Sequence, residues 1–294
     1  MSARADSRPC EPCGTSTATA IGAHEVQPDM SPDRCTIVAA VNDRTVLARN
    51  LLLSPDIAGG RQPDLLLKEG FNSAAAAYNR AIDEARSDIL VFVHQDVYLP
   101  EHWFDAVSRA IRSLDDAGIA WGVLGSFGVR GGSPGGWGRV YTTGRGLHGR
   151  VIHGPEPVET LDEIVLITRR STGLRFDAEL PHFHLYGTDL CLQARSAGLS
   201  NYAIPAFCVH NTNQLIELPA EFYRCHDHIK KKWRHCLPIH TSCIVISRFD
   251  RERHERRLKA LVHKALGRVT HPLARVDDPR KVCSLDLQIG RSRQ

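Results

Sequence analysis

One buried strand that ends in polar side chains constrains the fold of this chain more than any other feature. Residues 87–100 read SDILVFVHQDVYLP, and within them Ile89 to Val93 form an unbroken apolar run. An apolar run without alternation is typical of a strand that is covered on both faces in a parallel sheet. Helices supply such covers, so the run predicts an α/β protein.

Three polar residues, His94, Gln95 and Asp96, follow the run directly. Side chains alternate along an extended chain, so His94 and Asp96 project to one side and Gln95 to the other. In open α/β sheets, ligands bind outside the carboxyl ends of the strands. Asp96 therefore places a hard oxygen donor where a ligand or a divalent cation would lie.

Strand and helix signals alternate around this stretch, which predicts a mostly parallel sheet with right-handed crossovers. We expect strands at 35–41, 64–68, 89–93, 119–124, 161–168 and 201–210, and helices at 74–85, 101–115 and 189–198. Residues 125–157 interrupt the pattern with many glycines and prolines. A glycine-rich insertion beside a site is typical of a mobile binding loop.

Composition narrows the partners and the location. The 294 residues are 42% hydrophobic and 24% charged, as in an ordinary soluble protein with one large domain or one domain with appendages. The net charge of +4 permits phosphate-bearing partners, and we expect no nucleic acid because no basic stripe interleaved with aromatics occurs in the central part. Without an apolar signal core or an 18-residue apolar run, the expected location is cytoplasmic. The nine cysteines favour reduced thiols.

The order of several motifs resembles the GT-A-fold glycosyltransferases, and among them the streptomycin-biosynthesis-type glycosyltransferase-like branch. The motifs are AAAAYNRAIDEARSDILVFVHQDV, LDEIVLITRR, FHLYGTDLCLQARSAG and AIPAFCVHNT, between Arg34 and Asn213. The resemblance implies a GT-A fold, a mostly parallel central sheet flanked by helices. It also implies transfer of a sugar from a nucleotide-diphosphate sugar donor to the hydroxyl of an acceptor, which is an unidentified glycan, lipid or small molecule.

The resemblance further implies a Mn²⁺ or Mg²⁺ ion that bridges the two phosphates of the donor. The metal motif of the family is usually Asp-x-Asp, and the matching triplet here is His94, Gln95 and Asp96. Asp96 carries over as a metal ligand, and His210 matches a downstream position that often supplies a second one. The loss of one carboxylate either weakens metal binding or gives His94 another role.

The remaining site residues also come from the resemblance. Asn42 and Asp43 match the end of the first strand, where the family contacts the nucleoside, and Asp162 matches a region that lines the donor or acceptor pocket. Asp189 matches the carboxylate that acts as catalytic base in inverting members. A positioned base commonly contributes about 10² to 10⁴ in rate.

We expect four regions along the chain: a disordered leader at 1–33, a GT-A-like domain at 34–213, a helical extension at 214–270 and a tail at 271–294. The leader carries a single CxxC motif, Cys10 and Cys13. We interpret it as part of an inert tail rather than as a metal or redox site, because no second cysteine pair accompanies it.

The helical extension leaves two questions open. Cys225 and His228 share a helical face. They are either zinc ligands, or a packed thiol and a surface histidine. The basic helix at 248–268 has an apolar stripe that either docks on the core or lies on an anionic membrane at the inner face.

Two other functions remain alternatives. A catalytically silent sugar-nucleotide or glycan-binding module is the first, because His94 replaces an acidic residue of the metal motif. A nucleotidyltransferase ranks last, because the chain lacks a glycine-rich, lysine-bearing phosphate loop near the first strand.

Overall fold

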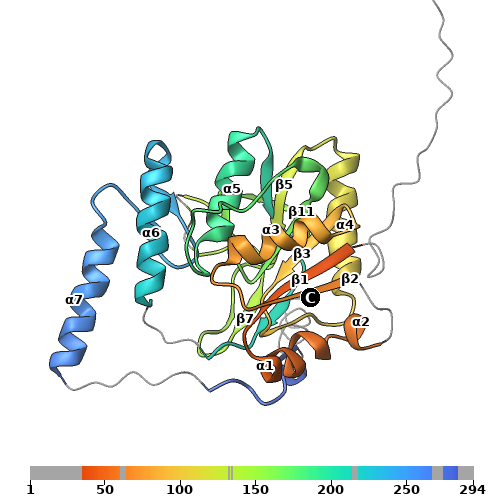
Figure 1. Cartoon of the computed structure of the whole chain (residues 1–294), viewed down its shortest axis with the longest axis horizontal. Coiled ribbons are helices and arrows are strands. Elements are labelled where there is room, and N and C mark those ends of the chain that lie inside the picture. The colour runs from red at the N-terminus through yellow and green to blue at the C-terminus, as the bar shows by residue number, and fades with distance from the viewer. Residues whose placement is uncertain are drawn as a thin grey trace, which may run out of the picture.

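A computed structural model describes residues 35–59, 64–131, 133, 135–213, 218–266 and 274–283. The expected leader, with Cys10 and Cys13, lies outside the described residues, as does most of the expected tail. The α/β class predicted from the sequence is confirmed: helices pack on both faces of a seven-stranded sheet (Figure 1).

The central sheet has the strand order β2-β1-β3-β11-β5-β12-β9. Its strands are β1 (Cys35–Val41), β2 (Asp64–Glu69), β3 (Ile89–Val93), β5 (Trp121–Gly125), β9 (Glu156–Val158), β11 (Val165–Arg169) and β12 (Ser200–Ala203). Strand β1 pairs parallel with β2 and β3, and β12 pairs parallel with β5. The other three pairings are antiparallel, so the sheet is mixed and less parallel than we expected.

The antiparallel strand β11 explains the difference. Parallel neighbours need a long crossover, usually a helix, that returns the chain to the starting edge of the sheet. Between β5 and β11 the described chain forms only short strands and loops, with no helix. The chain therefore enters β11 from the edge where β5 ended and runs antiparallel to both β3 and β5.

Helices α3 and α5 cover one face of the sheet, and α4 covers the other. The helices are α1 (Arg44–Arg49), α2 (Pro55–Ala58), α3 (Ala74–Glu84), α4 (Trp103–Asp116), α5 (Tyr186–Ser196), α6 (Ala220–Lys232) and α7 (Arg251–Ala265), with 3₁₀ turns η2 (Leu51–Leu53), η3 (Arg170–Thr172) and η4 (Arg234–Cys236). The sequence offers Asn72 or Ser73 as the cap of α3, and in the structure it is Ser73, whose hydroxyl accepts a hydrogen bond from Ala76 N at 3.2 Å. Helix α5 begins three residues before the expected Asp189.

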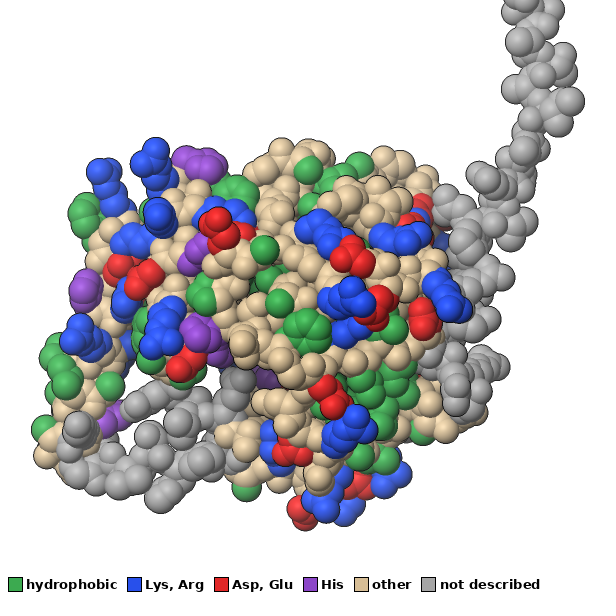
Figure 2. Space-filling model, in the orientation of Figure 1, with side chains coloured by type: hydrophobic (Ala, Val, Ile, Leu, Met, Phe, Trp, Pro, Cys, Tyr) green, Lys and Arg blue, Asp and Glu red, His purple; other side chains and the backbone are tan. Residues whose placement is uncertain are grey.

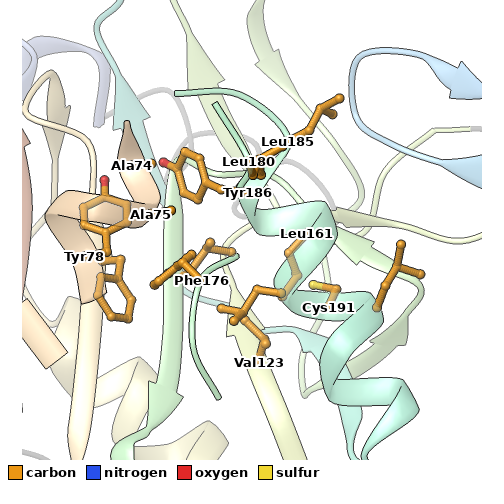
Figure 3. Close-up of a cluster of buried hydrophobic side chains, with 14 of the residues drawn as sticks. Ala74, Ala75, Tyr78, Val123, Leu161, Phe176, Leu180, Leu185, Tyr186 and Cys191 are labelled. Carbon is orange, nitrogen blue, oxygen red and sulfur yellow. The ribbon is translucent and has the colours of Figure 1, made fainter. Parts of the chain in front are cut away.

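Aromatic rings fill the core beneath α3 and α5. Tyr78, Phe92, Phe176 and Tyr186 contact one another with ring centroids 4.9 to 5.9 Å apart, and each is at most 3% exposed. Figure 3 shows the hydroxyl groups of Tyr78 and Tyr186 at the same end of this cluster. The cluster fixes the start of α5 against the sheet and carries two phenol groups to the edge where β3 ends.

The glycine-rich segment is a folded part of the molecule rather than the expected loop. It contributes the strands β6 (Gly128–Val129), β7 (Val140–Thr142) and β8 (Gly146–His148), and β6 pairs with β10 (Thr160–Leu161), which follows the segment. Two guanidinium groups contact the Trp137 ring, with Arg130 3.8 Å and Arg150 4.7 Å from its ring centroid. Gly138 has a φ of +87°, and a Cβ there would lie 2.1 Å from the carbonyl oxygen of Ser126. The glycines serve close approach of backbones as well as turning.

The second sheet brings a distant part of the sequence to the end of β3. It has the order β4-β13-β7-β8, in which β4 is Val97–Tyr98 and β13 is Cys208–His210. Strand β13 pairs antiparallel with β4, so that His210 lies opposite Val97. Because Val97 directly follows Asp96, this register places His210 beside the carboxylate that ends the β3 segment.

Helix α6 packs on the core through Phe222, Cys225 and Ile229, and a hairpin of β14 (Ile239–His240) and β15 (Val245–Ile246) follows it. Cys225 Sγ lies 2.9 Å from the carbonyl oxygen of Pro181, and His228 Nε2 lies 2.9 Å from Asp177 Oδ2. These two expected zinc candidates thus each have another partner. No helix among the described residues has the length and apolar character needed to cross a membrane.

Candidate active site

Three side chains meet where β3 and β13 end. One potential ligand atom from each of His94, Asp96 and His210 lies within 4.8 Å of the others. His210 Nε2 is 3.4 Å from Asp96 Oδ1, and His94 Nδ1 is 4.0 Å from the same oxygen. The sequence predicted Asp96 and His210 as neighbours through the family resemblance, and the structure brings them together with His94.

Charge and burial set the protonation of this triad. Burial lowers the pKa of His94 to about 4, although the negative charge of Asp96 acts to raise it. Burial also lowers the pKa of His210, but the negative charge of Asp96 outweighs it and raises that pKa above its usual value. Burial raises the pKa of Asp96, but the positive charge of His210, with a smaller contribution from Arg275, reverses this and holds that pKa far below its usual range.

Tyr186 fixes which nitrogen of His94 faces the triad. Its hydroxyl donates to the carbonyl oxygen of Glu163 at 3.3 Å and lies 2.7 Å from His94 Nε2. When this hydroxyl donates its one proton to Glu163, it accepts a hydrogen bond from His94, whose ring proton is in that case on Nε2. The lone pair of His94 is then on Nδ1, the nitrogen that lies on the side of Asp96.

The triad fits a divalent metal ion. His210 Nε2 is buried and makes no hydrogen bond of good geometry among the described residues. His94 is neutral near pH 7, and Asp96 is ionised, so each offers a lone pair to a cation. Metal bonds of about 2.0–2.2 Å place neighbouring ligand atoms about 3 Å apart, which small side-chain rotations would reach from the observed spacing. Two imidazoles and one carboxylate are also a common ligand set of transition metals.

A cavity of about 740 Å³ opens beside the triad. Its lining includes the ends of β1 and β2, the loop between β2 and α3, the His94 to Asp96 segment, and the side chains of Tyr78, Phe183, His184 and Tyr186. Gln95 joins two of these elements, because its Oε1 accepts from the backbone nitrogens of Asn42 and Asp43 at 3.0 and 3.1 Å. Its Nε2 donates to the side-chain oxygen of Asn42. Asn42 and Gln95 therefore lie together at the cavity, as the sequence predicted for strand ends.

Two further predicted residues lie near this site in different roles. The Asp43 carboxylate caps α1, accepting from Thr45 N at 2.8 Å and Val46 N at 3.1 Å, and is partly committed to the fold. Asp162 is half-buried, and its charge raises the pKa values of both His94 and His210. Asp162 thus belongs to the electrostatic surroundings of the triad, although it does not line the cavity described above.

Asp189 has surroundings that differ from those expected of a catalytic base. Its side chain is 1% exposed in the first turn of α5. It accepts hydrogen bonds from three donors: Trp233 Nε1 at 2.6 Å, Lys232 Nζ at 2.8 Å and Gln193 Nε2 at 2.6 Å. A base must contact the hydroxyl that it deprotonates. A carboxylate that is buried and already accepts three hydrogen bonds joins α5 to α6, and the catalytic role that the resemblance implied for Asp189 stays a prediction.

Some site residues carry no signal in the sequence. Glu163 is half-buried beside the first turn of α5, where desolvation and the charge of Asp162 raise its pKa well above the usual value. Asn211 hydrogen-bonds through its side chain to Asn50 and to the backbone of Val276, and its carbonyl oxygen accepts from Arg275 Nε at 3.0 Å. Residues 274–283, which fall in the expected tail, are thereby held next to the triad. Only the fold brings them there.

The protein has three potential metal ligands and a cavity at the ends of its sheet strands. Open α/β proteins that bind ligands have their binding sites at this place. A family model described as "Glycosyltransferase like family" matches residues 37–224, more than half of the sequence. The chain belongs to this glycosyltransferase-like family. Together with the sheet and its helical layers, the match confirms the GT-A fold class that the resemblance implied.

Comparison with individual proteins gives low to moderate sequence identity. "ATP synthase subunits region ORF 6" from Fuscovulum blasticum is 30% identical over 171 residues, which are 55% of this chain and 66%, just under two thirds, of that protein. The structure of S. aureus TarS 1-349 has a TM-score of 0.42 and 14% identity, covering 68% of this chain and 65% of that one. The mannosyltransferase PcManGT from Pyrobaculum calidifontis, in complex with GDP-Man and Mn²⁺, has a TM-score of 0.41 and 16% identity, covering 71% and 67%.

Proposed function

We propose that this protein is a metal-dependent glycosyltransferase that moves a sugar from a nucleotide-diphosphate sugar to an acceptor hydroxyl. The observation that carries the proposal is the His94, Asp96 and His210 triad at the edge of a 740 Å³ cavity, in a chain of the glycosyltransferase-like family. A cavity of this volume is within the range of cofactor and small-ligand sites. Membership of the streptomycin-biosynthesis-type branch stays a prediction.

The donor set favours Mn²⁺ over Mg²⁺. Mg²⁺ prefers oxygen ligands in octahedral geometry, whereas imidazole nitrogen suits transition metals. His94 stands where the family usually has a carboxylate, so two of the three candidate ligands are nitrogens. A bound divalent ion would neutralise the diphosphate and act as a Lewis acid for its departure.

Two predicted donor contacts lie where a nucleoside could reach them. Gln95 and Asn42 hold each other at the ends of neighbouring strands β1 and β3, and both line the cavity. Their hydrogen bonds fix the backbone of the turn between β1 and α1. We infer that this amide pair positions the nucleoside part of the donor, while the triad lies toward the diphosphate. Asp43 contributes by capping α1 rather than by a free carboxylate.

For the base, we propose Asp162 in place of Asp189. Asp162 is half-buried rather than enclosed, its charge reaches both histidines of the triad, and only one of its oxygens has a described hydrogen bond, from Ile164 N at 3.2 Å. The second carboxylate oxygen, for which no hydrogen bond is described, can accept the proton of an acceptor hydroxyl, and in-line attack by that hydroxyl would invert the sugar carbon.

Donor turnover tests the function directly. Purified protein is incubated with a panel of nucleotide sugars that includes GDP-mannose, with Mn²⁺, with Mg²⁺ or with a chelator, and released nucleoside diphosphate is measured. We expect release with Mn²⁺, less with Mg²⁺, and loss of release by at least about a hundredfold in Asp96→Asn. Asp116→Asn, at an exposed position at the end of α4, is the matched control.

The base assignment has its own comparison. Asp162→Asn should lower kcat by about 10² or more while donor KM stays near that of the parent. Asp189→Asn should instead lower thermal stability, because it weakens the contacts between α5 and α6. A variant Asp189→Asn that folds as stably as the parent and loses turnover would return the base role to Asp189.

A silent binding module is the second candidate, and the replacement of a motif carboxylate by His94 favours it. Calorimetry separates the two functions. Donor binding that is unaffected by Mn²⁺, with no nucleoside diphosphate released from any donor and acceptor pair, supports the module. Metal-dependent binding accompanied by release supports the transferase.

A further inference from the structure

Helix α7 is attached to the rest of the protein by its charged face. Glu252, Arg253 and Arg256 lie within four positions of one another and so share one side of the helix. They make these contacts: Glu252 Oε2 accepts from Val245 N at 2.8 Å, Arg253 pairs with Asp227 and lies over the Tyr223 ring, and Arg256 Nη2 donates to the Cys243 carbonyl oxygen at 2.8 Å. The helix therefore uses hydrogen bonds and ion pairs, rather than apolar packing, to contact α6 and the β14–β15 hairpin.

The apolar stripe of the same helix points away from the protein. Leu258, Leu261, Val262 and Leu266 recur at i, i+3, i+4 and i+8 and are 64%, 58%, 47% and 63% exposed. Phe249, two residues before α7, is 80% exposed. An amphipathic helix of a globular protein normally turns this stripe to the core. Of the expectations for this helix, docking of the stripe on the core is therefore wrong.

This exposure is concentrated in one place. Seven large hydrophobic side chains are exposed in the described part of the chain, and five of them lie between Phe249 and Leu266. Figure 1 shows α7 standing at one end of the molecule beside α6, away from the sheet. In Figure 2, hydrophobic side chains lie along that edge with Lys and Arg side chains next to them. An apolar patch bordered by charge marks an interaction surface.

The charge beside the stripe is positive. Residues 248–266 contain seven Lys and Arg against three Asp and Glu, a net charge of +4 that equals that of the whole chain. The three acids are neutralised within the protein, because Asp250 pairs with Lys230, Glu252 with Arg256 and Glu255 with Arg251.

A basic cavity of about 750 Å³ adjoins this segment. It is lined by Asp227, Lys230, Lys231, Arg234, His235, Leu237 and Arg248. Its one acid, Asp227, is paired with Arg253. Arg248 at its border directly precedes the exposed Phe249, so the cavity and the apolar stripe are continuous along the chain.

We propose that Phe249 and the outer face of α7 form a docking surface for a membrane that carries anionic phospholipid. The leucines and Phe249 enter the headgroup and acyl boundary, and the surrounding Lys and Arg side chains attract the anionic headgroups, as in other interfacial helices. The cavity that contains Arg248 offers cationic side chains to the headgroup phosphates. The charged face remains bound to α6 and the hairpin, so docking needs no rearrangement of the protein.

The charge argues against a second copy of this chain as the occupant. Two copies that met through this face would bring two segments of net charge +4 together, with the acids already neutralised inside each copy. Like charges at an interface lower its stability. An anionic bilayer instead satisfies both the apolar and the charged parts of the surface.

Vesicle flotation of the full chain tests the proposal. One set of vesicles is phosphatidylcholine alone, and the other is an equal mixture of phosphatidylcholine and phosphatidylglycerol. We expect binding to the anionic set only, weakening as NaCl is raised because salt screens the headgroup charge. Binding should fall by at least about tenfold in the triple variant Leu258→Ser, Leu261→Ser and Val262→Ser, since each loses buried apolar area in the bilayer.

Two matched variants separate the causes. Val151→Ser removes an exposed apolar side chain from another part of the surface, 52% exposed, and should bind as the parent does. Arg257→Gln with Lys259→Gln removes two exposed charges of α7 and should reduce both the binding and its salt dependence. Because these side chains are exposed, thermal melting should be unchanged in every variant.

Three outcomes would overturn the proposal. The first is equal binding of the parent to both kinds of vesicle, and the second is undiminished binding of the triple variant. The third is a dimer of the parent in sedimentation equilibrium that the triple variant abolishes, with no vesicle binding, which would make a second copy the occupant. None of these results bears on donor turnover, so the docking surface and the proposed function are tested separately.

Discussion

At the scale of single residues, Tyr186 links the aromatic core to the candidate metal site. Its ring packs among Tyr78 and Phe176, while its hydroxyl lies between His94 Nε2 and the Glu163 carbonyl oxygen. A group that hydrogen-bonds to the far nitrogen of a histidine ligand fixes its tautomer and orientation. The core therefore helps to determine what His94 offers to a cation.

Removal of the hydroxyl should weaken metal binding without unfolding the protein. Tyr186→Phe keeps the buried ring but frees His94 to rotate or change tautomer, so we expect about a 10- to 100-fold rise in the Mn²⁺ concentration that gives half-maximal turnover. Tyr202→Phe, on the half-buried β12 position, serves as the control. An unchanged Mn²⁺ requirement in Tyr186→Phe would show that the Tyr186 hydroxyl does not orient His94 for metal binding.

At the scale of elements, ion pairs hold α6 against α5 and the loop before it. Lys232 bridges Asp177 at 2.7 Å and Asp189 at 2.8 Å, and His228 adds a second contact to Asp177. Burial raises the pKa of Asp177, but the hydrogen bonds from Lys232 and His228 outweigh it and lower that pKa from 3.8 to about 2. A lowered carboxylate pKa means that the ionised form stabilises the fold.

The sign of this shift predicts how stability depends on pH. Because the folded pKa lies below the unfolded value, the stabilisation is complete above about pH 4 and disappears as pH falls toward 2. Asp177→Asn should lower the free energy of unfolding by about 1–2 kcal/mol at pH 7, since solvent screens part of the interaction. Urea denaturation at several pH values checks this. A difference between parent and variant that stays constant down to pH 2 would contradict it.

The glycine-rich segment gives a second prediction at this scale. Gly138→Ala puts a side chain on a residue with a left-handed φ and makes it clash with the Ser126 carbonyl oxygen. The substitution should therefore lower the free energy of unfolding by about 3 kcal/mol or more. Gly173→Ala is the matched control, because its φ is +72° but nothing lies within 4 Å of the added Cβ. The control should cost only about 1–2 kcal/mol. Equal losses in thermal or urea denaturation would show that close packing at Gly138 does not matter.

At the scale of the whole molecule, a metal ion that binds the triad would join β3 to β13 and stabilise the native state. Mn²⁺ at about 100 times its dissociation constant adds about 2.7 kcal/mol to the free energy of unfolding. In a protein of this size that corresponds to a rise in Tm of roughly 5–10 °C. Thermal scans with and without Mn²⁺ should show the rise in the parent and in Asp116→Asn. Asp96→Asn should show none, and a full rise in that variant would remove the triad as the binding site.

The sequence predicted most of the local structure. The apolar run of β3, the cap at Ser73 and the α/β class follow from side chains that lie close together along the chain, and propensity and periodicity report such short-range effects. The polar ends of β1 and β3 also placed Asn42, Gln95 and Asp96 at one edge of the sheet, and the structure brings these residues to one cavity.

Long-range packing decided the rest. The antiparallel entry of β11, the pairing of β13 with β4 that brings His210 to Asp96, and the enclosure of Asp189 by Lys232 and Trp233 each depend on residues more than 40 positions apart. The direction in which the apolar stripe of α7 points also depends on contacts with other elements. The sequence by itself determined that the helix has an apolar and a charged face, but only the partners offered by α6 and the hairpin, which are polar, decided which face turns inward.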